Sequence, residues 1–410
     1  MTLLYSLGIL VYYGLILIVS GFNKKAKQWI KGRKGVLKFL RSKIGPQDRV
    51  IWFHVSSLGE FEQGRPVMEA LKKEFPDRKI LLTFFSPSGY EIRKHYSGAD
   101  IICYLPLDTF FNARRFIGIT HPELTIFVKY DFWYHMLRQA KKSGSKLILI
   151  SAAFRENQVF FKPYGGWYRK MLNWFDHLFV QNQESLNLLQ KNNLNKCSLA
   201  GDTRFDRVSQ IAHGSQEIEI ANTFSKNSFT IVCGSTWPAD EQLLLQYIHE
   251  THHPVKLILA PHEIHHTHIS AIEKQLKTPY ALFSKAREMN YAQARVLIID
   301  NIGMLSSLYR YGQVAYIGGG FGTSIHNTLE AAVYGIPVLF GPQYHKFQEA
   351  RDLLMCNGAR TFLLYEELKE MLDGFFVNSE LLENSGKAAG NYVNSMRGAT
   401  QTITDYLKNN

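Results

Sequence analysis

The segment that most constrains the fold of this chain is residues 314–341, which read VAYIGGGFGTSIHNTLEAAVYGIPVLFG. Two apolar runs typical of buried strands flank a glycine-rich turn and a stretch of helical composition. Such a strand–turn–helix–strand unit is typical of a parallel sheet, whose ligands bind at the carboxyl ends of the strands. The glycines over residues 318–322 let the backbone approach a ligand closely, although a tightly packed corner without a ligand also needs them.

A predicted helix follows this turn and begins at His326, Asn327 and Thr328, with Glu330 in its first turn. Free backbone N–H groups at a helix start, together with the helix dipole, favour a phosphate or a carboxylate. Glu330 is placed to accept hydrogen bonds from ribose hydroxyls. The pattern therefore predicts a nucleotide site, and the packing corner stays open as the alternative.

Predicted strands and helices alternate along the chain, and the alternation restarts near residue 230. The first strands cover residues 50–55, 80–85, 101–104, 124–128, 147–151 and 177–180, and the second group covers residues 230–233, 257–260, 296–299, 314–317 and 337–340. Helical patterns lie between them, at residues 61–74, 132–142, 184–191, 239–249, 268–275 and 327–334. We expect an α/β protein with two doubly wound, Rossmann-like domains that face each other across a cleft.

The chain begins with an apolar run, residues 3–22, which has no charged side chain and is about as long as a membrane-spanning helix. Nine basic residues and no acidic residue follow between residues 24 and 43. Because positively charged flanks stay on the cytoplasmic side, we expect a membrane anchor with the globular part inside the cell. A cleaved signal peptide is the alternative, but it carries its basic residues before the apolar run.

The formal net charge of +12 is mostly a property of this basic segment, because the rest of the chain carries only +3. A basic surface spread over the fold is not indicated, so we expect no nucleic-acid partner. A polybasic segment beside a membrane binds anionic lipid headgroups. The four cysteines have no CxxC spacing, which argues against a zinc site or a disulfide framework and suits a reducing compartment.

These patterns divide the chain into five parts. We expect a transmembrane anchor (1–23), a basic juxtamembrane segment (24–45), an N-terminal domain (46–208), a C-terminal domain (209–390) and a C-terminal helix that returns to the first domain (391–410).

Glu60 lies where the predicted strand 50–55 gives way to a helix. A carboxylate at this position can deprotonate an acceptor hydroxyl, and the helix dipole helps to keep it ionised. An acid that only stabilises the helix start is the common alternative. Arg204, at the expected domain junction, can hold a phosphate or carboxylate from the cleft, or else makes a surface ion pair.

Histidines cluster in residues 261–268, which read PHEIHHTH. The order HEIHH lacks the HExxH spacing of zinc-binding helices, so we expect no metal site here. The segment follows a predicted strand, and a loop in that position can carry nucleotide contacts.

Taken in order, these segments resemble the 3-deoxy-D-manno-octulosonic acid (Kdo) transferases of lipopolysaccharide synthesis, and the similarity spans almost the whole chain. Besides the N-terminal anchor, the segments that carry it are HVSSLGE (54–60), residues 83–91, YLPLD (104–108), GDTRFDRV (201–208), GSTWPADE (234–241), residues 300–305 and GGGFGTSIHNTLEAAVYGIPVLFGP (318–342). Each segment alone is a weak signal, whereas their order together is specific.

The resemblance implies a GT-B fold and an inverting, metal-independent transfer of Kdo from CMP-Kdo to the lipid A precursor (lipid IVA) at the bacterial inner membrane, without a cofactor. The N-terminal domain would bind the acceptor, with Glu60 as general base, and Asp131 and Arg204 would steady charge in the transition state. The family's CMP contacts correspond here to Pro261, His262, Ile302, Gly303, Met304, Asn327, Thr328, Leu329 and Glu330.

Four stretches depart from the family's pattern. The chain has KYDFW at residues 129–133 in place of ExExW, GDTRFD in place of GNLKFD, HNTLEA in place of HNPLEP, and PHE in place of PRH. The first departure leaves the role of Asp131 open, and the last alters a contact to the cytidylate.

Two other functions fit the same residues. A GT-B glycosyltransferase with a UDP-sugar donor and a lipid-linked acceptor would use the same glycine-rich turn and the same glutamate. A membrane-tethered nucleotide-binding protein without catalysis would bind a nucleotide and transfer nothing.

Overall fold

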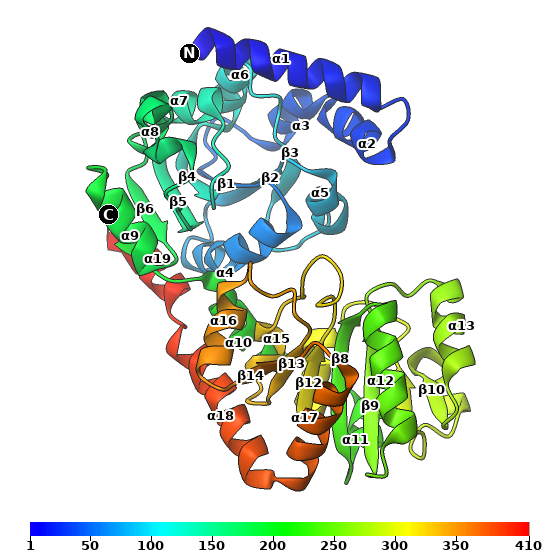
Figure 1. Ribbon diagram of the computed structural model, residues 1–410. Coiled ribbons are helices and arrows are strands. Elements are labelled where there is room, and N and C mark those ends of the chain that lie inside the picture. The colour runs from blue at the N-terminus through cyan, green and yellow to red at the C-terminus, as the bar shows by residue number, and fades with distance from the viewer. Residues whose placement is uncertain (410) are drawn as a thin grey trace. The chain divides into compact units, whose positions relative to one another are not determined.

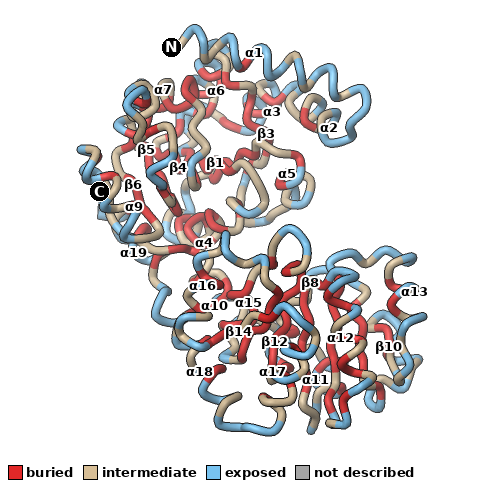
Figure 2. Tube along the Cα trace, viewed as in Figure 1, coloured by how far each residue is buried: buried red, intermediate tan, exposed pale blue. Residues whose placement is uncertain are grey.

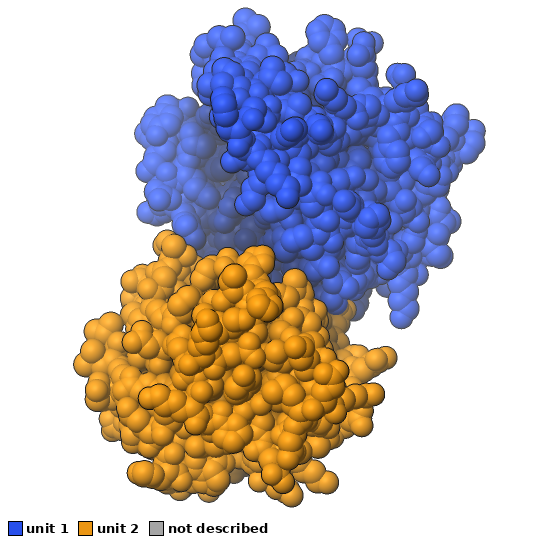
Figure 3. Space-filling model, turned by 90° about the vertical axis from the view of Figure 1, so that its right-hand side faces the viewer, with its two compact units in different colours: residues 1–207, 397–410 blue, residues 208–396 orange. Residues whose placement is uncertain are grey.

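The structure is a computed structural model that describes residues 1–409. It divides into two compact units, which are Met1–Arg207 with Arg397–Asn410, and Val208–Met396 (Figure 3). Each unit contains one parallel, seven-stranded sheet.

The sheet of the first unit has the strand order β3-β2-β1-β4-β5-β6-β7 (Figure 1). Its strands are β1 (Val50–Val55), β2 (Lys79–Phe84), β3 (Ile101–Tyr104), β4 (Pro122–Val128), β5 (Lys146–Ala152), β6 (His177–Val180) and β7 (Cys197–Leu199). Strands β2 and β3 lie on one side of β1, and β4 to β7 lie on its other side. A topological switch point therefore lies between β1 and β4, where α/β proteins bind their ligands.

Helices cover both faces of this sheet, so its central strands are buried along their whole length (Figure 2). One face packs against α3, α6 and α7, and the other packs against α4 and α19. The helices of this unit are α1 (Thr2–Val19), α2 (Lys24–Arg33), α3 (Val36–Lys43), α4 (Leu58–Glu74), α5 (Pro87–Arg93), α6 (Phe110–Thr120), α7 (Tyr134–Lys142), α8 (Gly166–Leu172), α9 (Gln183–Lys191) and α19 (Ala399–Asn409), and α10 (Thr203–Gly214) runs from this unit into the second.

The sheet of the second unit has the strand order β10-β11-β9-β8-β12-β13-β14, with a switch point between β8 and β12 (Figure 1). Its strands are β8 (Phe229–Thr236), β9 (Val255–Pro261), β10 (Tyr280–Leu282), β11 (Val296–Ile298), β12 (Val314–Ile317), β13 (Val338–Phe340) and β14 (Ala359–Thr361). Its helices are α11 (Glu219–Ser225), α12 (Pro238–Glu250), α13 (His266–Gln275), α14 (Leu305–Leu308), α15 (Leu329–Ala332), α16 (Gln348–Met355), α17 (Tyr365–Val377) and α18 (Ser379–Ser395).

The predicted alternation of strands and helices is confirmed in both units, with some differences at the sheet edges. The sequence patterns do not predict β7, β10 or β14, which are three residues long and lie at sheet edges. Such short edge strands lack the apolar run that identifies a central strand.

The helix predicted over residues 327–334 is wrong in its length, because α15 is a single turn from Leu329 to Ala332. Gly335, whose φ is 68°, and Pro337 follow it and prevent the helix from continuing. Residues 326–328 are therefore loop, and a helix of one turn offers little dipole to an anion.

The single helix expected over residues 391–410 is also wrong, because α18 ends at Ser395 and α19 begins at Ala399. Gly398 lies between them with a φ of 112°. Asp206 caps α19 by accepting hydrogen bonds from the N–H groups of Gly398 and Thr400, each at 2.7 Å. This cap fixes the last helix on the first unit, where it packs against α4.

The apolar helix α1 lies along the first unit, and its polar side chains contact that unit. Tyr5 donates a hydrogen bond to the buried Asp108 at 2.6 Å, and Ser6 lies 2.9 Å from His135 Nε2. The opposite side of the helix is an exposed apolar face that includes Leu3 and Leu7. By length and composition, α1 is the one helix among residues 1–409 that qualifies as a membrane span.

The basic segment after α1 forms α2 and α3, which are packed onto the first unit. Trp29 and Leu40 are buried, and the guanidinium of Arg33 stacks on the ring of Trp29 at 3.6 Å and donates to the carbonyl oxygen of Phe85 at 2.8 Å. Burial lowers the pKa of Arg33 to about 9. The remaining lysines of the segment have exposed or half-buried side chains, so their charges remain at the surface.

Candidate active site

Glu60 stands in the first turn of α4, directly beyond the carboxyl end of β1. Ser57 caps the helix, because its hydroxyl accepts a hydrogen bond from the N–H of Glu60. The carboxylate of Glu60 turns back toward the strand and accepts a hydrogen bond from the N–H of Ser56. The predicted position of this acid, at a strand end and a helix mouth, is therefore confirmed, whereas its catalytic role stays a prediction.

Asp131 follows β4, so it stands on the other side of the switch point from Glu60. One of its oxygens, Oδ2, is 2.8 Å from His54 Nε2, accepts the indole N–H of Trp133 at 2.9 Å, and accepts the hydroxyl of Ser56. Burial raises the pKa of Asp131, but these three polar contacts outweigh that effect and hold the pKa below its ordinary range. Asp131 is therefore a fixed anion at neutral pH.

Ser56 joins the two carboxyl groups, since its N–H binds Glu60 and its hydroxyl binds Asp131. Burial, followed by repulsion from Asp131, raises the pKa of Glu60 to about 7, although Lys129 and the Ser56 N–H oppose the rise. A carboxyl group with this pKa is divided between its acid and base forms at neutral pH, which suits a general base.

A buried hydrogen-bonded chain supports Asp131 from behind. His54 has a relative exposure of 0%, and its Nδ1 lies 2.9 Å from the hydroxyl of Thr83, which also accepts from Trp52 Nε1 at 2.8 Å. His54 thus faces Asp131 with Nε2 and the Thr83 hydroxyl with Nδ1, and that hydroxyl donates to the carbonyl oxygen of Phe53 at 3.2 Å. The sequence does not predict these supporting residues, although His54 and Ser56 lie in the HVSSLGE segment.

Arg204 lies near the start of α10, where its guanidinium binds Asp202 at 2.7 Å. Thr203 donates a hydrogen bond to the carbonyl oxygen of Gln63, which is on α4 one turn beyond Glu60. The structure thus brings Arg204 to the helix that carries Glu60, with Asp202 as an ion-pair partner that the sequence analysis did not predict.

In the second unit, most of the predicted nucleotide residues lie in loops at the carboxyl edge of the sheet. Pro261 ends β9, and Asn327 accepts from the N–H of Leu329 at 3.1 Å and donates to Glu330 at 3.0 Å. The hydroxyl of Thr328 is buried and has no hydrogen-bond partner among residues 1–409. Ile302 and Gly303 lie in the loop after β11, where Ile302 is 87% exposed, and Met304 immediately precedes α14.

Three rings meet at this edge, from the loops after β8, β9 and β12. The His262 ring stacks on Trp237 at 4.6 Å and on His326 at 4.5 Å. Trp237 Nε1 donates a hydrogen bond to His326 Nε2 at 3.2 Å. His326 also lies against Gly319, where a Cβ atom would approach the imidazole to 3.1 Å, so this turn needs its glycine. His262 was predicted as a nucleotide contact, whereas Trp237 had no predicted role and His326 only marked the predicted helix start.

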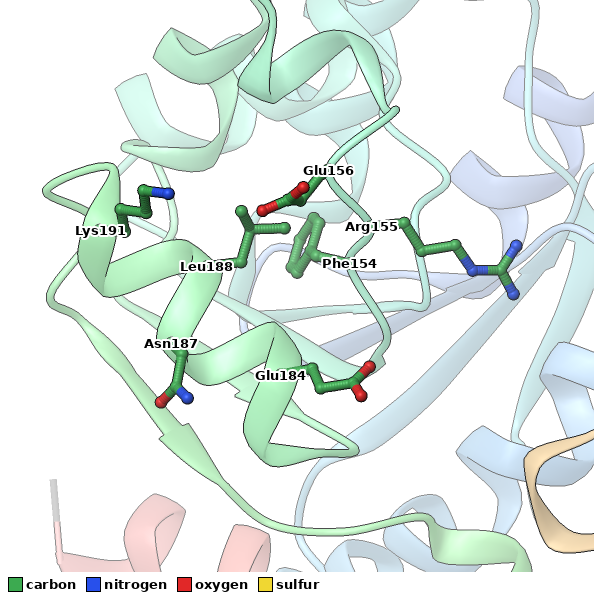
Figure 4. Close-up of a pocket in the computed structure, with 7 residues that line it drawn as sticks. All are labelled: Phe154, Arg155, Glu156, Glu184, Asn187, Leu188 and Lys191. Carbon is green, nitrogen blue, oxygen red and sulfur yellow. The ribbon is translucent and has the colours of Figure 1, made fainter. Parts of the chain in front are cut away.

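A cavity of about 390 Å³ lies elsewhere in the first unit, between the segment after β5 and α9 (Figure 4). Its wall carries Arg155, Glu156, Glu184 and Lys191, so positive and negative charges balance. Figure 4 shows Arg155 extending away from the other labelled side chains. None of the predicted site residues lines this cavity. Polar groups that converge at the switch points therefore identify the candidate site better than the volume of this cavity does.

The histidine-rich segment 261–268 does not gather into a metal-binding group. His268 pairs with Glu241 at 3.0 Å, and His262 belongs to the ring cluster. Among residues 1–409, no group of three or more histidine, cysteine, aspartate or glutamate side chains is arranged to hold a metal ion.

Comparison with known proteins gives matches at the level of family and of fold. Residues 30–207 match the family described as 3-Deoxy-D-manno-octulosonic-acid transferase (kdotransferase). The 3-deoxy-D-manno-octulosonic acid transferase of Aquifex aeolicus is 29% identical over 315 residues, covering 75% of this chain and 80% of that protein. The enzyme of the same name from Chlamydia trachomatis serovar A is 27% identical, covering 88% of this chain and 81% of that protein.

Solved structures show the same fold at low sequence identity. UDP-GlcNAc 2-epimerase from Neisseria meningitidis has a TM-score of 0.62 at 14% identity, covering 88% of this chain and 100% of that chain. MurG from Acinetobacter baumannii has a TM-score of 0.55 at 12% identity, with the same coverage. The predicted α/β class with a GT-B fold is therefore confirmed. The family match lies in the first unit, and the named relatives are similar over most of the chain. The chain therefore resembles the Kdo transferases along most of its length and is a glycosyltransferase.

Proposed function

We propose that this protein transfers Kdo from CMP-Kdo to a hydroxyl group of the lipid A precursor lipid IVA, as a step of lipopolysaccharide core synthesis. Similarity to the Kdo transferases supports the transferred sugar, because the relatives are named for it. The observation that carries the mechanism is the half-buried Glu60 at a switch point, with its pKa raised to about 7.

In this proposal Glu60 is the general base of an inverting, single-step displacement. The acceptor oxygen attacks the anomeric carbon of Kdo while the bond from that carbon to the CMP phosphate oxygen breaks. The hydroxyl proton passes to Glu60, and the electron pair of the broken bond leaves with CMP. Asp131 keeps the proton affinity of Glu60 high by repulsion, since its own charge is fixed by His54, Ser56 and Trp133.

The leaving phosphate needs positive or hydrogen-bonding groups, because charge develops on it as the bond breaks. We assign this role to the strand-end loops of the second unit, with Pro261, His262, Asn327, Thr328, Leu329 and Glu330 as CMP contacts and with Ile302, Gly303 and Met304 beside them. Arg204 contributes a cation if its guanidinium exchanges Asp202 for substrate. No metal ion or other cofactor takes part in this scheme.

The acceptor is embedded in a membrane, and the exposed apolar face of α1 together with the lysines of α2 and α3 suits that location. We assign the protein to the cytoplasmic side of a bacterial inner membrane, with α1 as the anchor and anionic lipid headgroups as partners of the basic helices.

The decisive experiment incubates the purified full-length protein in detergent micelles with Kdo, CTP, an enzyme that forms CMP-Kdo from them, and lipid IVA, and weighs the lipid product by mass spectrometry. Addition of Kdo is expected for the wild type and none for Glu60→Gln, whose CMP binding should be unchanged. Glu62→Gln is the matched control, because Glu62 lies on the same helix and pairs with Arg93. A UDP-sugar donor in place of CMP-Kdo, or full transfer by Glu60→Gln, would overturn the proposal.

A further inference from the structure

The loops that meet at the central strands of the second sheet carry no permanent positive charge. Residues 234–241, 261–268, 299–305 and 318–330 follow β8, β9, β11 and β12 and contain no lysine or arginine. Lys346, in the loop after β13, is the nearest such residue in strand order, and its side chain is exposed. A phosphate at the switch point would therefore meet imidazole groups and backbone N–H groups first.

The two imidazoles in the ring cluster differ in their surroundings. His326 Nε2 accepts the indole N–H of Trp237, so that nitrogen carries no proton. Burial, followed by repulsion from His262, lowers the pKa of His326 to about 4. His262 is exposed, and its ring lies at 24° to the indole face of Trp237, where a positive charge is stabilised by the ring.

The other ionisable groups around the cluster have partners of their own. Asp240, in the first turn of α12, accepts the N–H groups of Trp237 and Gly319, each at 2.9 Å. Glu241 accepts from Thr236 at 3.1 Å and pairs with His268 of α13. Glu263 and His265, in the same loop as His262, are both exposed.

We propose that His262 binds the phosphate of the donor nucleotide as an imidazolium, that Trp237 and His326 hold its ring in place, and that nucleotide binding therefore takes up a proton. This inference rests on the proposed function, because it takes CMP as the nucleotide. It adds Trp237 and His326 to the site as positioning residues and makes donor affinity depend on pH.

The test measures CMP binding to the full-length protein by titration calorimetry, in buffers of different ionisation enthalpy, from about pH 7 to about pH 8.5, where CMP is already a dianion. Wild-type affinity should fall roughly five- to tenfold per pH unit, with uptake of about one proton at the upper end of this range. His262→Gln should bind weakly at every pH. His262→Arg should bind tightly at every pH, because arginine keeps its charge throughout this range.

Two further variants separate a positioning role from general damage. His266→Gln changes an exposed histidine outside the ring cluster and should keep the wild-type pH dependence. Trp237→Phe keeps a ring under His262 but removes the N–H bond to His326, and it should weaken CMP binding about two- to fivefold with the pH dependence retained.

A flat wild-type affinity over this pH range, or wild-type binding by His262→Gln, would overturn the inference. Kdo transfer together with a flat CMP affinity would reject this inference alone. Absence of both CMP binding and Kdo transfer would reject the proposed function as well.

Discussion

Replacing Asp131 by asparagine tests whether its charge sets the proton affinity of Glu60. Asparagine keeps an oxygen that accepts from Ser56 and Trp133 but removes the negative charge that repels the Glu60 carboxylate. Because repulsion from Asp131 raises the pKa of Glu60, the variant should hold Glu60 in its base form at a lower pH than the wild type does.

The size of the shift follows from the geometry of Ser56. Its N–H and its hydroxyl bind the two carboxyl groups, so these lie about 6 Å apart given the dimensions of one residue. Two unit charges at about 6 Å repel by about 3 kcal/mol at an effective dielectric constant of about 20. The polar contacts to Asp131 spread its charge over several groups, so we expect about half of this value, which is about one pKa unit.

The assay is the pH dependence of kcat/KM for Kdo transfer. The acidic limb of the wild type should have its midpoint near pH 7, and that of Asp131→Asn should lie about one unit lower. Glu62→Gln, on the outer side of the same helix, should leave the limb unmoved. The reasoning would be refuted if the acidic midpoint of the pH profile stayed in place in Asp131→Asn while the maximal kcat/KM fell. That result would indicate that Asp131 acts directly on the transition state.

Three further predictions concern stability. Because the pKa of Glu60 is raised in the folded protein, Glu60 contributes fully to stability only below its pKa in the unfolded chain. That contribution is lost as the pH rises through about 7. Glu60→Gln should therefore abolish transfer yet raise the free energy of unfolding by about 1–3 kcal/mol at about pH 8. Thermal unfolding of the variant and the wild type at acidic and at alkaline pH checks this, and an equal difference at both pH values would contradict it. Tyr5→Phe leaves Asp108 buried without its phenol donor and should lower the free energy of unfolding by about 1–3 kcal/mol, measured by urea unfolding in micelles, where an unchanged midpoint would argue against the contact. Asp206→Ala removes the cap of α19 and should cost about 1 kcal/mol in the same assay, with protease cleavage near residue 397 as a second readout that should stay slow if the cap is unimportant.

The central strands of both sheets could be predicted from the sequence, because they are buried on both faces and read as continuous apolar runs. The position of Glu60 followed from the same pattern, since the strand 50–55 ends five residues before it. The edge strands β7, β10 and β14 and the single-turn helix α15 were beyond such reasoning, because none of them has a long apolar run or a full helical period.

The support of the candidate site could not be predicted, because it joins residues far apart in the chain. His54, Thr83 and Asp131 lie on three different strands or strand ends and meet only when the sheet forms. The Trp237–His262–His326 cluster arises in the same way from three loops. Residue spacing within one segment gives no information on contacts between distant segments. It nevertheless pointed to Asp131 in the first group and to His262 in the second.

The hydrogen bond between Tyr5 and Asp108 links the apolar helix α1 to the segment that carries Asp131. Asp108 also accepts the N–H groups of His135 and Met136, at 3.0 Å and 2.8 Å, in the first turn of the helix that begins directly after Trp133. Removing α1 would therefore leave Asp108 without its phenol donor and would loosen the start of α7, which follows the segment that holds Asp131. The way α1 packs on the first unit therefore bears on Asp131 and, through the charge of Asp131, on the proton affinity of Glu60.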